Sequence, residues 1–132
     1  ISYNRKNFKG KIDSLEDRAL VEHLNKTTIK CLDFENFLNE INPSKKDFMF
    51  LDPPYDSDFS TYANIKFVEK DQVRLANYLK KTKARFMLVI KNTEFIYSLY
   101  KDFNIKSFDK KYLVSFKNRN DRKAKHLLIT NY

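Results

Sequence analysis

The chain has 132 residues, with 26 Lys and Arg against 17 Asp and Glu, a formal net charge of +9 and one cysteine. This length suits a single domain with one modest core, and an apolar content of 42% excludes a disordered tail. No run approaches the roughly 18 apolar residues of a membrane span, and one cysteine cannot form an internal disulfide or a thiolate metal cage. We therefore expect a cytoplasmic domain with no membrane segment and no bound metal.

The positive charge favours a polyanionic partner. Each Lys or Arg placed on a phosphate releases a condensed counterion, so a basic chain of this kind suits a nucleic acid. A genome rich in A and T also enriches lysine codons, and that alternative requires no partner. The chain begins at Ile1 and contains a single glycine, which together predict a piece of a longer protein.

The first part of the chain predicts short elements joined by polar segments. Residues 1–13 are basic and lack a clear hydrophobic period, which predicts an irregular arm. Ser14 supplies an N-cap hydroxyl followed by acidic residues, so we expect a helix from there to about residue 26. Residues 27–32 favour a short strand, and residues 35–41 have the apolar spacing of a helix.

Strands and helices alternate through the rest of the chain. Residues 48–51 form a continuous apolar run, as in a strand of a sheet that is covered on both faces. The next expected elements are a polar loop to about 67, a helix over 69–81, a strand over 85–90, a helix over 93–101, strands over 105–108, 112–116 and 127–130, and a charged loop over 117–123. This order predicts an α/β fold with a mostly parallel sheet.

The same pattern gives the candidate core. The apolar residues expected to face inward include Phe48, Phe50, Val73, Leu75, Ala76, Leu79, Phe86 and Met87. Cys31 fits a small buried apolar residue better than a nucleophile. His23 and His126 are isolated in the sequence, and we expect no metal site from either of them.

Three polar residues directly follow predicted strands, namely Asp33, Asp52 and Asn92. In sheets of this class, ligands bind beyond the carboxyl ends of the strands. The three side chains are therefore expected along one edge of the sheet, as parts of one candidate site.

The run Asp52-Pro53-Pro54-Tyr55 is the most informative motif. Its two prolines fix two φ angles and remove two backbone donors, which leaves a stiff turn with carbonyls free to accept. An exocyclic amine could donate to Asp52 and to the Pro53 carbonyl while Tyr55 stacks on the ring that bears the amine. The alternative is an ordinary strand exit, in which Asp52 caps the following turn.

This run, placed after a buried strand, resembles motif IV of the amino-group DNA methyltransferases. The wider chain resembles the Dam-type DNA adenine methylase family, over essentially the whole chain but only the second half of the family's length. The further positions that carry the resemblance are Tyr3 to Lys6 and Phe8, Asp33 and Phe34, Phe59, Tyr62, Phe67, Asp71, Gln72, Leu75, Val89 to Asn92, Arg122, Lys123, Leu127 and Leu128.

The resemblance implies a reaction, a cofactor and a fold. Asp52, Pro53, Pro54 and Tyr55 would form the catalytic corner, which holds an adenine flipped out of double-stranded DNA. The cofactor would be S-adenosylmethionine, with Asp33, Phe34 and Asp52 against it. The fold would be a Rossmann-like methyltransferase fold of which only the C-terminal part of the sheet is present. Residues 1–13 would end a target-recognition segment, and residues 14–132 would belong to the catalytic domain.

Two departures from the family pattern limit what this chain does by itself. The family's glycine-rich donor loop is absent, and Gly10 cannot replace it. The first strands of the fold are missing as well, so the N-terminal half of the same protein becomes a required partner. We expect the chain alone to bind the donor poorly and to be inactive.

Two basic segments are candidate DNA contacts. They comprise Tyr3, Arg5 and Lys6 near the start and Arg119, Arg122 and Lys123 in the charged loop. A mobile terminus and a solvated turn are the respective alternatives. Other functions remain open: a methyltransferase acting on base amines of ribosomal RNA, or a catalytically dead nucleic-acid-binding remnant. A cognate restriction endonuclease is a further expected partner.

Overall fold

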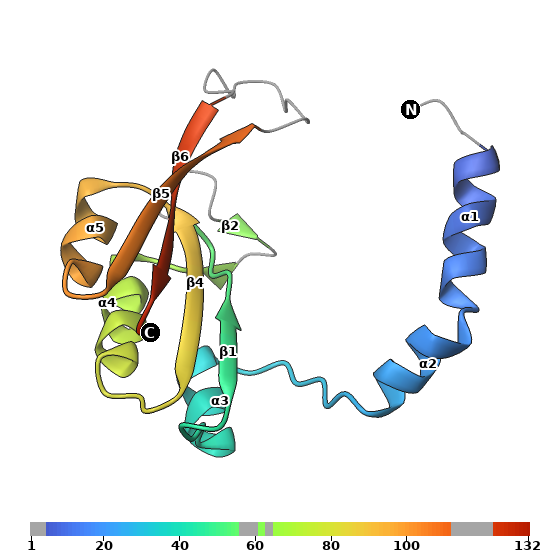
Figure 1. Ribbon diagram of the computed structural model, residues 1–132, viewed down its shortest axis with the longest axis horizontal. Helices are drawn as coiled ribbons and strands as arrows, with labels where there is room; N and C mark the ends of the chain where they lie inside the picture. Colours follow the sequence, from blue (N-terminus) through green and yellow to red (C-terminus); the bar gives the residue numbers. More distant parts are fainter. Residues whose placement is uncertain (1–4, 56–60, 63–64, 112–122) are drawn as a thin grey trace. The chain divides into compact units, whose positions relative to one another are not determined.

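The computed structural model describes residues 5–55, 61–62, 65–111 and 123–132 (Figure 1). The chain forms two compact units, Ile1–Asp33 and Phe34–Tyr132. Among the described residues, none of the helices combines the length and apolar character needed to cross a membrane.

The first unit contains two helices, α1 (Arg5–Leu15) and α2 (Arg18–Asn25). The prediction of an irregular arm is wrong for residues 5–13, which lie in α1, while residues 1–4 lie outside the described residues. The predicted helix start at Ser14 is wrong as well. The hydroxyl of Ser14 donates to the Gly10 carbonyl over 2.7 Å, so Ser14 lies inside α1. The carboxylate of Asp17 instead caps α2, accepting from the backbone N–H groups of Ala19 and Leu20.

The predicted strand over residues 27–32 is also wrong, because this segment contains neither helix nor strand. Ile29 is 80% exposed, and Cys31 is exposed rather than buried. Side chains that favour a strand form one only where a partner strand offers backbone hydrogen bonds and a packed face. No strand lies among the described residues of this unit.

The second unit is built on a four-stranded sheet with the order β1-β4-β6-β5. Its strands are β1 (Phe48–Leu51), β4 (Arg85–Lys91), β5 (Asn104–Lys111) and β6 (Lys123–Thr130). β1 and β4 are parallel, whereas β6 is antiparallel to both β4 and β5. The sheet is therefore mixed rather than mostly parallel.

Two short strands, β2 (Thr61–Tyr62) and β3 (Ile65–Lys66), form an antiparallel pair within the segment predicted as a polar loop. The strand predicted over 112–116 lies outside the described residues, as does nearly all of the charged loop over 117–123.

Three helices cover one face of the sheet, as Figure 1 shows for α4 and α5: α3 (Phe34–Ile41), α4 (Glu69–Leu79) and α5 (Glu94–Tyr100). All three confirm predicted helices. They contribute to one core with the strand residues of that face, among them Met49, Phe86, Leu88, Ile90, Leu127 and Ile129. Val73 points away from this core and is 37% exposed, contrary to prediction.

The opposite face of the sheet has no helix over it among the described residues of this unit. Phe48 and Phe50 are 55% and 63% exposed, and Met87 is half-buried. Only Phe86 of the four aromatic or sulfur-containing strand residues predicted for the core is fully buried. The expectation of a sheet covered on both faces is therefore wrong for this unit, and we call this surface the open face.

Candidate active site

The carboxyl ends of two paired strands bring the first site residues together. β1 and β4 run parallel with Leu51 opposite Leu88, so the residues after each strand emerge at the same edge of the sheet. Asp52 follows β1 directly and Asn92 follows β4. The backbone N–H of Asn92 donates to the carbonyl of Lys125 over 2.9 Å, which ties this edge to β6.

The corner formed by Asp52–Tyr55 leaves a carboxylate available to a ligand. Asp52 is exposed, while Pro53, Pro54 and Tyr55 are half-buried. The Tyr55 hydroxyl donates to Asp52 Oδ1 over 3.4 Å, a long contact that an incoming amine can displace. The corner therefore combines an accessible acceptor with a supported aromatic ring.

Gln72 holds this corner from the helix side through a hydrogen bond that the motif alone does not predict. Its side chain is 1% exposed, and its Nε2 donates to the Pro54 carbonyl over 2.9 Å. A signal was present in the sequence, because Gln72 shares the spacing of Leu75, Ala76 and Leu79 along α4. A lone amide within such an apolar stripe indicates a specific buried hydrogen bond.

His126 supports the same corner from the open face. Its ring lies 5.1 Å from that of Tyr55 in an edge-on arrangement and 5.8 Å from that of Phe108. These two rings cover the imidazole, which has no exposed surface. His126 has no marked neighbour in the sequence, because Tyr55 lies about half the chain away from it.

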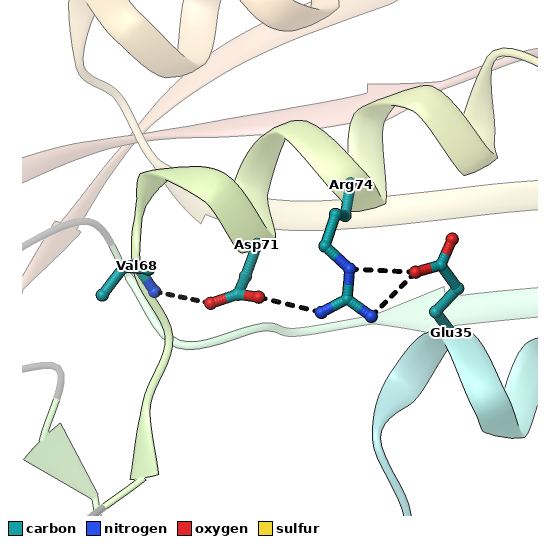
Figure 2. A network of polar contacts seen from close by, with 4 residues as sticks. All are labelled: Glu35, Val68, Asp71 and Arg74. Carbon is teal, nitrogen blue, oxygen red and sulfur yellow. Dashed lines mark hydrogen bonds and ion pairs between the residues drawn. The ribbon is translucent and has the colours of Figure 1, made fainter.

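A polar network fixes the start of α3 against α4 (Figure 2). The guanidinium of Arg74 pairs with Glu35 over 2.7 Å and with Asp71 over 2.9 Å. The other carboxylate oxygen of Asp71 accepts from the backbone N–H of Val68 over 3.0 Å and so caps α4.

Phe34, a cofactor candidate, lies beside this network. Its ring is 5.7 Å from that of Phe67, and the Arg74 guanidinium lies 4.9 Å from its centroid. The other cofactor candidate, Asp33, is exposed and ends the first unit, where no strand precedes it. The prediction that Asp33 directly follows a strand is therefore wrong, whereas Asp52 and Asn92 do follow paired strands.

The DNA candidates divide between described and undescribed segments. Arg5 and Lys6 begin α1, whose exposed residues include Lys9 and Lys11. Lys123 opens β6, whereas Tyr3, Arg119 and Arg122 lie outside the described residues. Within the described part of the chain, no three His, Cys, Asp or Glu side chains group as metal ligands would.

The fold and the corner define a mixed α/β domain with an acidic, proline-rich site at the carboxyl edge of its sheet. A family model of D12 class N6 adenine-specific DNA methyltransferases matches residues 2–114, so the chain belongs to this family.

Curated relatives agree with this assignment. The chain is 37% identical over 100 residues to the type II methyltransferase M.CviBI of Paramecium bursaria Chlorella virus NC1A, covering 74% of this chain and 38% of the relative. It is 29% identical to the type II methyltransferase M1.LlaDCHI of Lactococcus lactis subsp. cremoris, covering all of this chain and 49% of the relative. The retron Ec67 DNA adenine methylase of Escherichia coli is 33% identical, with 67% and 31% covered. The chain thus spans less than half the length of these relatives.

Proposed function

We propose that the protein containing this chain is a site-specific DNA methyltransferase, which transfers a methyl group from S-adenosylmethionine to the N6 amine of adenine. The observation that carries this proposal is the corner at Asp52–Tyr55, where an exposed carboxylate and a supported ring lie at the carboxyl edge of the sheet. Membership of the D12 class family supports adenine as the base and DNA as its carrier.

The corner suits an exocyclic amine for a chemical reason. Two acceptors, the Asp52 carboxylate and the Pro53 carbonyl, would each take one N–H of the amine and leave the nitrogen lone pair free to attack. Tyr55 would stack on the base. A base inside the duplex cannot reach this corner, so the target adenine is flipped out of the helix. The attack is an in-line displacement, in which the protein mainly supplies positioning.

The chain carries residues that fit part of the methyl donor. The exposed carboxylates of Asp33 and Asp52 suit hydroxyl and cationic groups, and the half-buried ring of Phe34 offers an apolar surface for adenosine. S-adenosylmethionine, when bound, supplies an electrophilic methyl group, so the reaction requires neither a nucleophilic side chain nor a metal.

The open face supports a second polypeptide segment as part of the same enzyme. It carries a groove of about 550 Å³ in which apolar side chains such as Met87, Leu128 and Tyr132 outnumber polar ones such as Lys106. We propose that the other half of a Rossmann-like methyltransferase fold covers this face and contributes the remaining donor contacts. Residues 14–132 would then be the C-terminal part of the catalytic domain, and residues 1–13 the end of a target-recognition segment.

DNA contacts and cellular context follow from the same proposal. Tyr3, Arg5 and Lys6 would contact DNA near the start of the chain, and Arg119, Arg122 and Lys123 would contact backbone phosphates. The net charge of +9 supports such contacts. Because relatives are named as type II methyltransferases, we place the enzyme in a cytoplasmic restriction-modification system with a cognate endonuclease.

Mass spectrometry of nucleosides tests the proposal. The longest reading frame that contains this chain is incubated with S-adenosylmethionine and unmethylated duplex DNA, which is then digested. We expect N6-methyladenine, and we expect Asp52→Ala to lower its rate of formation at least about 100-fold. Asp47→Ala is the matched control, because Asp47 precedes β1 at the opposite end from Asp52 and is also exposed.

The other outcomes distinguish the alternatives. Methylcytosine would mean that the corner was interpreted correctly and the base wrongly. Methylated RNA with unmethylated DNA would favour an RNA amine methyltransferase. A protein that binds DNA and methylates nothing would be a remnant, and the proposed activity would be wrong. The 132-residue chain alone is expected to be inactive, so methylation by it would contradict the role of the open face.

A further inference from the structure

Gln72 is a buried amide whose side chain makes one hydrogen bond among the described residues, fewer than its amide can form. Its Nε2 donates to the Pro54 carbonyl, whereas its Oε1 is buried and has no hydrogen-bond partner among the described residues. The reverse amide orientation would set two acceptor oxygens against each other. An unpaired buried acceptor costs about 1–3 kcal/mol, so Gln72 is a poor choice for stability alone.

The carbonyl that Gln72 binds controls where Tyr55 lies. Proline fixes φ, and Pro54 also restricts ψ of Pro53, but ψ of Pro54 stays free, and neither proline has an N–H with which a neighbouring strand could hold the backbone. The Pro54 carbonyl belongs to the peptide unit that leads into Tyr55, so its direction sets the path of the chain at that residue. The bond from Gln72 therefore fixes a rotation that the two prolines leave open.

The corner is held from both sides of the sheet. Gln72 reaches Pro54 from the helix layer, and His126 contacts the Tyr55 ring from the open face. His126 constrains the ring, while Gln72 constrains the backbone that carries it. Removal of the Gln72 donor would leave the contacts of the ring with His126 and Asp52 but would release the carbonyl that sets the direction of the backbone at Tyr55.

We propose that Gln72 is a positioning residue for methyl transfer, which acts through the Pro54 carbonyl to hold Tyr55 in its stacking position. This inference deepens the proposed function and rests on it, because the value of a fixed Tyr55 depends on a flipped base. Gln72 itself touches neither base nor donor in this account, and its effect on rate passes through Tyr55.

Steady-state kinetics of the full reading frame test the proposal. Gln72→Met keeps an unbranched side chain of similar length but removes the donor. We expect kcat to fall about 10- to 100-fold, because small displacements of a positioning group have effects of this size. KM for DNA should change far less, since phosphate contacts dominate affinity. The midpoint of thermal unfolding should stay close to that of the wild type, because the substitution also removes the orphaned acceptor.

Two comparisons separate positioning from a structural role. Tyr78→Phe removes another hydrogen bond from α4 to a backbone carbonyl, that of Leu38 at 3.4 Å, and should leave kcat unchanged. The double variant Gln72→Met/Tyr55→Ala should be no slower than Tyr55→Ala alone. A wild-type kcat in Gln72→Met, or a loss that adds fully to that of Tyr55→Ala, would overturn the proposal.

A spectroscopic arm tests the positioning independently of methylation. With 3,5-difluorotyrosine at position 55, we expect the ¹⁹F resonance to shift or broaden in Gln72→Met and to stay unchanged in Tyr78→Phe. If the wild-type protein methylates nothing, the proposed function fails while this arm still decides whether Gln72 positions Tyr55. An unchanged resonance in Gln72→Met would overturn the inference.

Discussion

The two faces of the four-stranded sheet differ in composition and in what covers them, because the open face mixes apolar side chains such as Phe50 with cations such as Arg85 and Lys106. On one face Phe86, Leu88 and Ile90 pack under the helix layer of α3, α4 and α5 and have no exposed surface. On the other face Phe50 keeps 63% of its surface exposed. The alternation along β4 places buried Leu88 and half-buried Val89 next to each other on opposite faces. An apolar strand residue such as Phe50 is therefore buried only where a helix lies over it, and its hydrophobicity alone does not decide how much it stabilises this chain.

The largest expected effect on stability comes from shortening a side chain on the face of the sheet that the helices cover. Leu88→Ala should lower the free energy of unfolding by about 3 kcal/mol, because the surrounding core cannot collapse fully into the space left behind. Val89→Ala is the matched control, and it should cost under about 1 kcal/mol. Urea denaturation of the chain, followed by circular dichroism, measures both. Equal losses would mean that the open face is covered in this chain after all.

A smaller loss of stability is expected when the ion pairs between α3 and α4 are removed. Arg74 joins α3 to α4 through its ion pairs with Glu35 and Asp71 (Figure 2). Its guanidinium also lies over the ring of Phe34. Arg74→Met should lower the free energy of unfolding by about 1 kcal/mol. The effect is small because the Arg74 side chain is about one third exposed, and water weakens its ion pairs with the two carboxylates. The loss should shrink in high salt.

The matched control for this network is a cation with a single exposed partner. Arg18 pairs with Glu22 within α2, and its side chain is 93% exposed. Arg18→Met should leave the urea midpoint unchanged. If Arg18→Met lowered the stability as much as Arg74→Met does, the loss would come from removing a positive charge and not from breaking the polar network.

The sequence was informative where local pattern and packing agree. The helix at 69–81 was predicted from the apolar stripe that includes Leu75 and Leu79, and these residues are buried as expected. The strand at 48–51 was placed correctly, but its exposed face was not, since burial of Phe50 depends on what lies over the sheet. The strand expected over 27–32 failed for a related reason, because pairing requires a partner that propensity cannot supply.

The candidate site shows the same division between local and distant information. Asp52, Pro53, Pro54 and Tyr55 are consecutive, so their motif could be recognised in one chain. Gln72 and His126 contact that motif from α4 and β6, and only the fold brings them to it. Asn92 was predicted at the edge because a strand end is a local feature, even though its neighbour β1 lies far back in the sequence.

The smallest expected effect on stability lies in the turn that directly precedes β1. The carboxylate of Asp47 accepts from the backbone N–H and the hydroxyl of Ser44, each over 2.8 Å, and these bonds lower the pKa of Asp47 below its ordinary value of 3.8. Since the folded pKa is the lower one, the charged group stabilises the fold above pH 3.8, and this contribution is lost as the pH falls through the folded value. Asp47→Asn should therefore unfold at a slightly lower temperature than the wild type near neutral pH, and the two melting temperatures should converge in acid. A difference that stays constant down to acid pH would assign the effect to the shape of the turn instead of its charge.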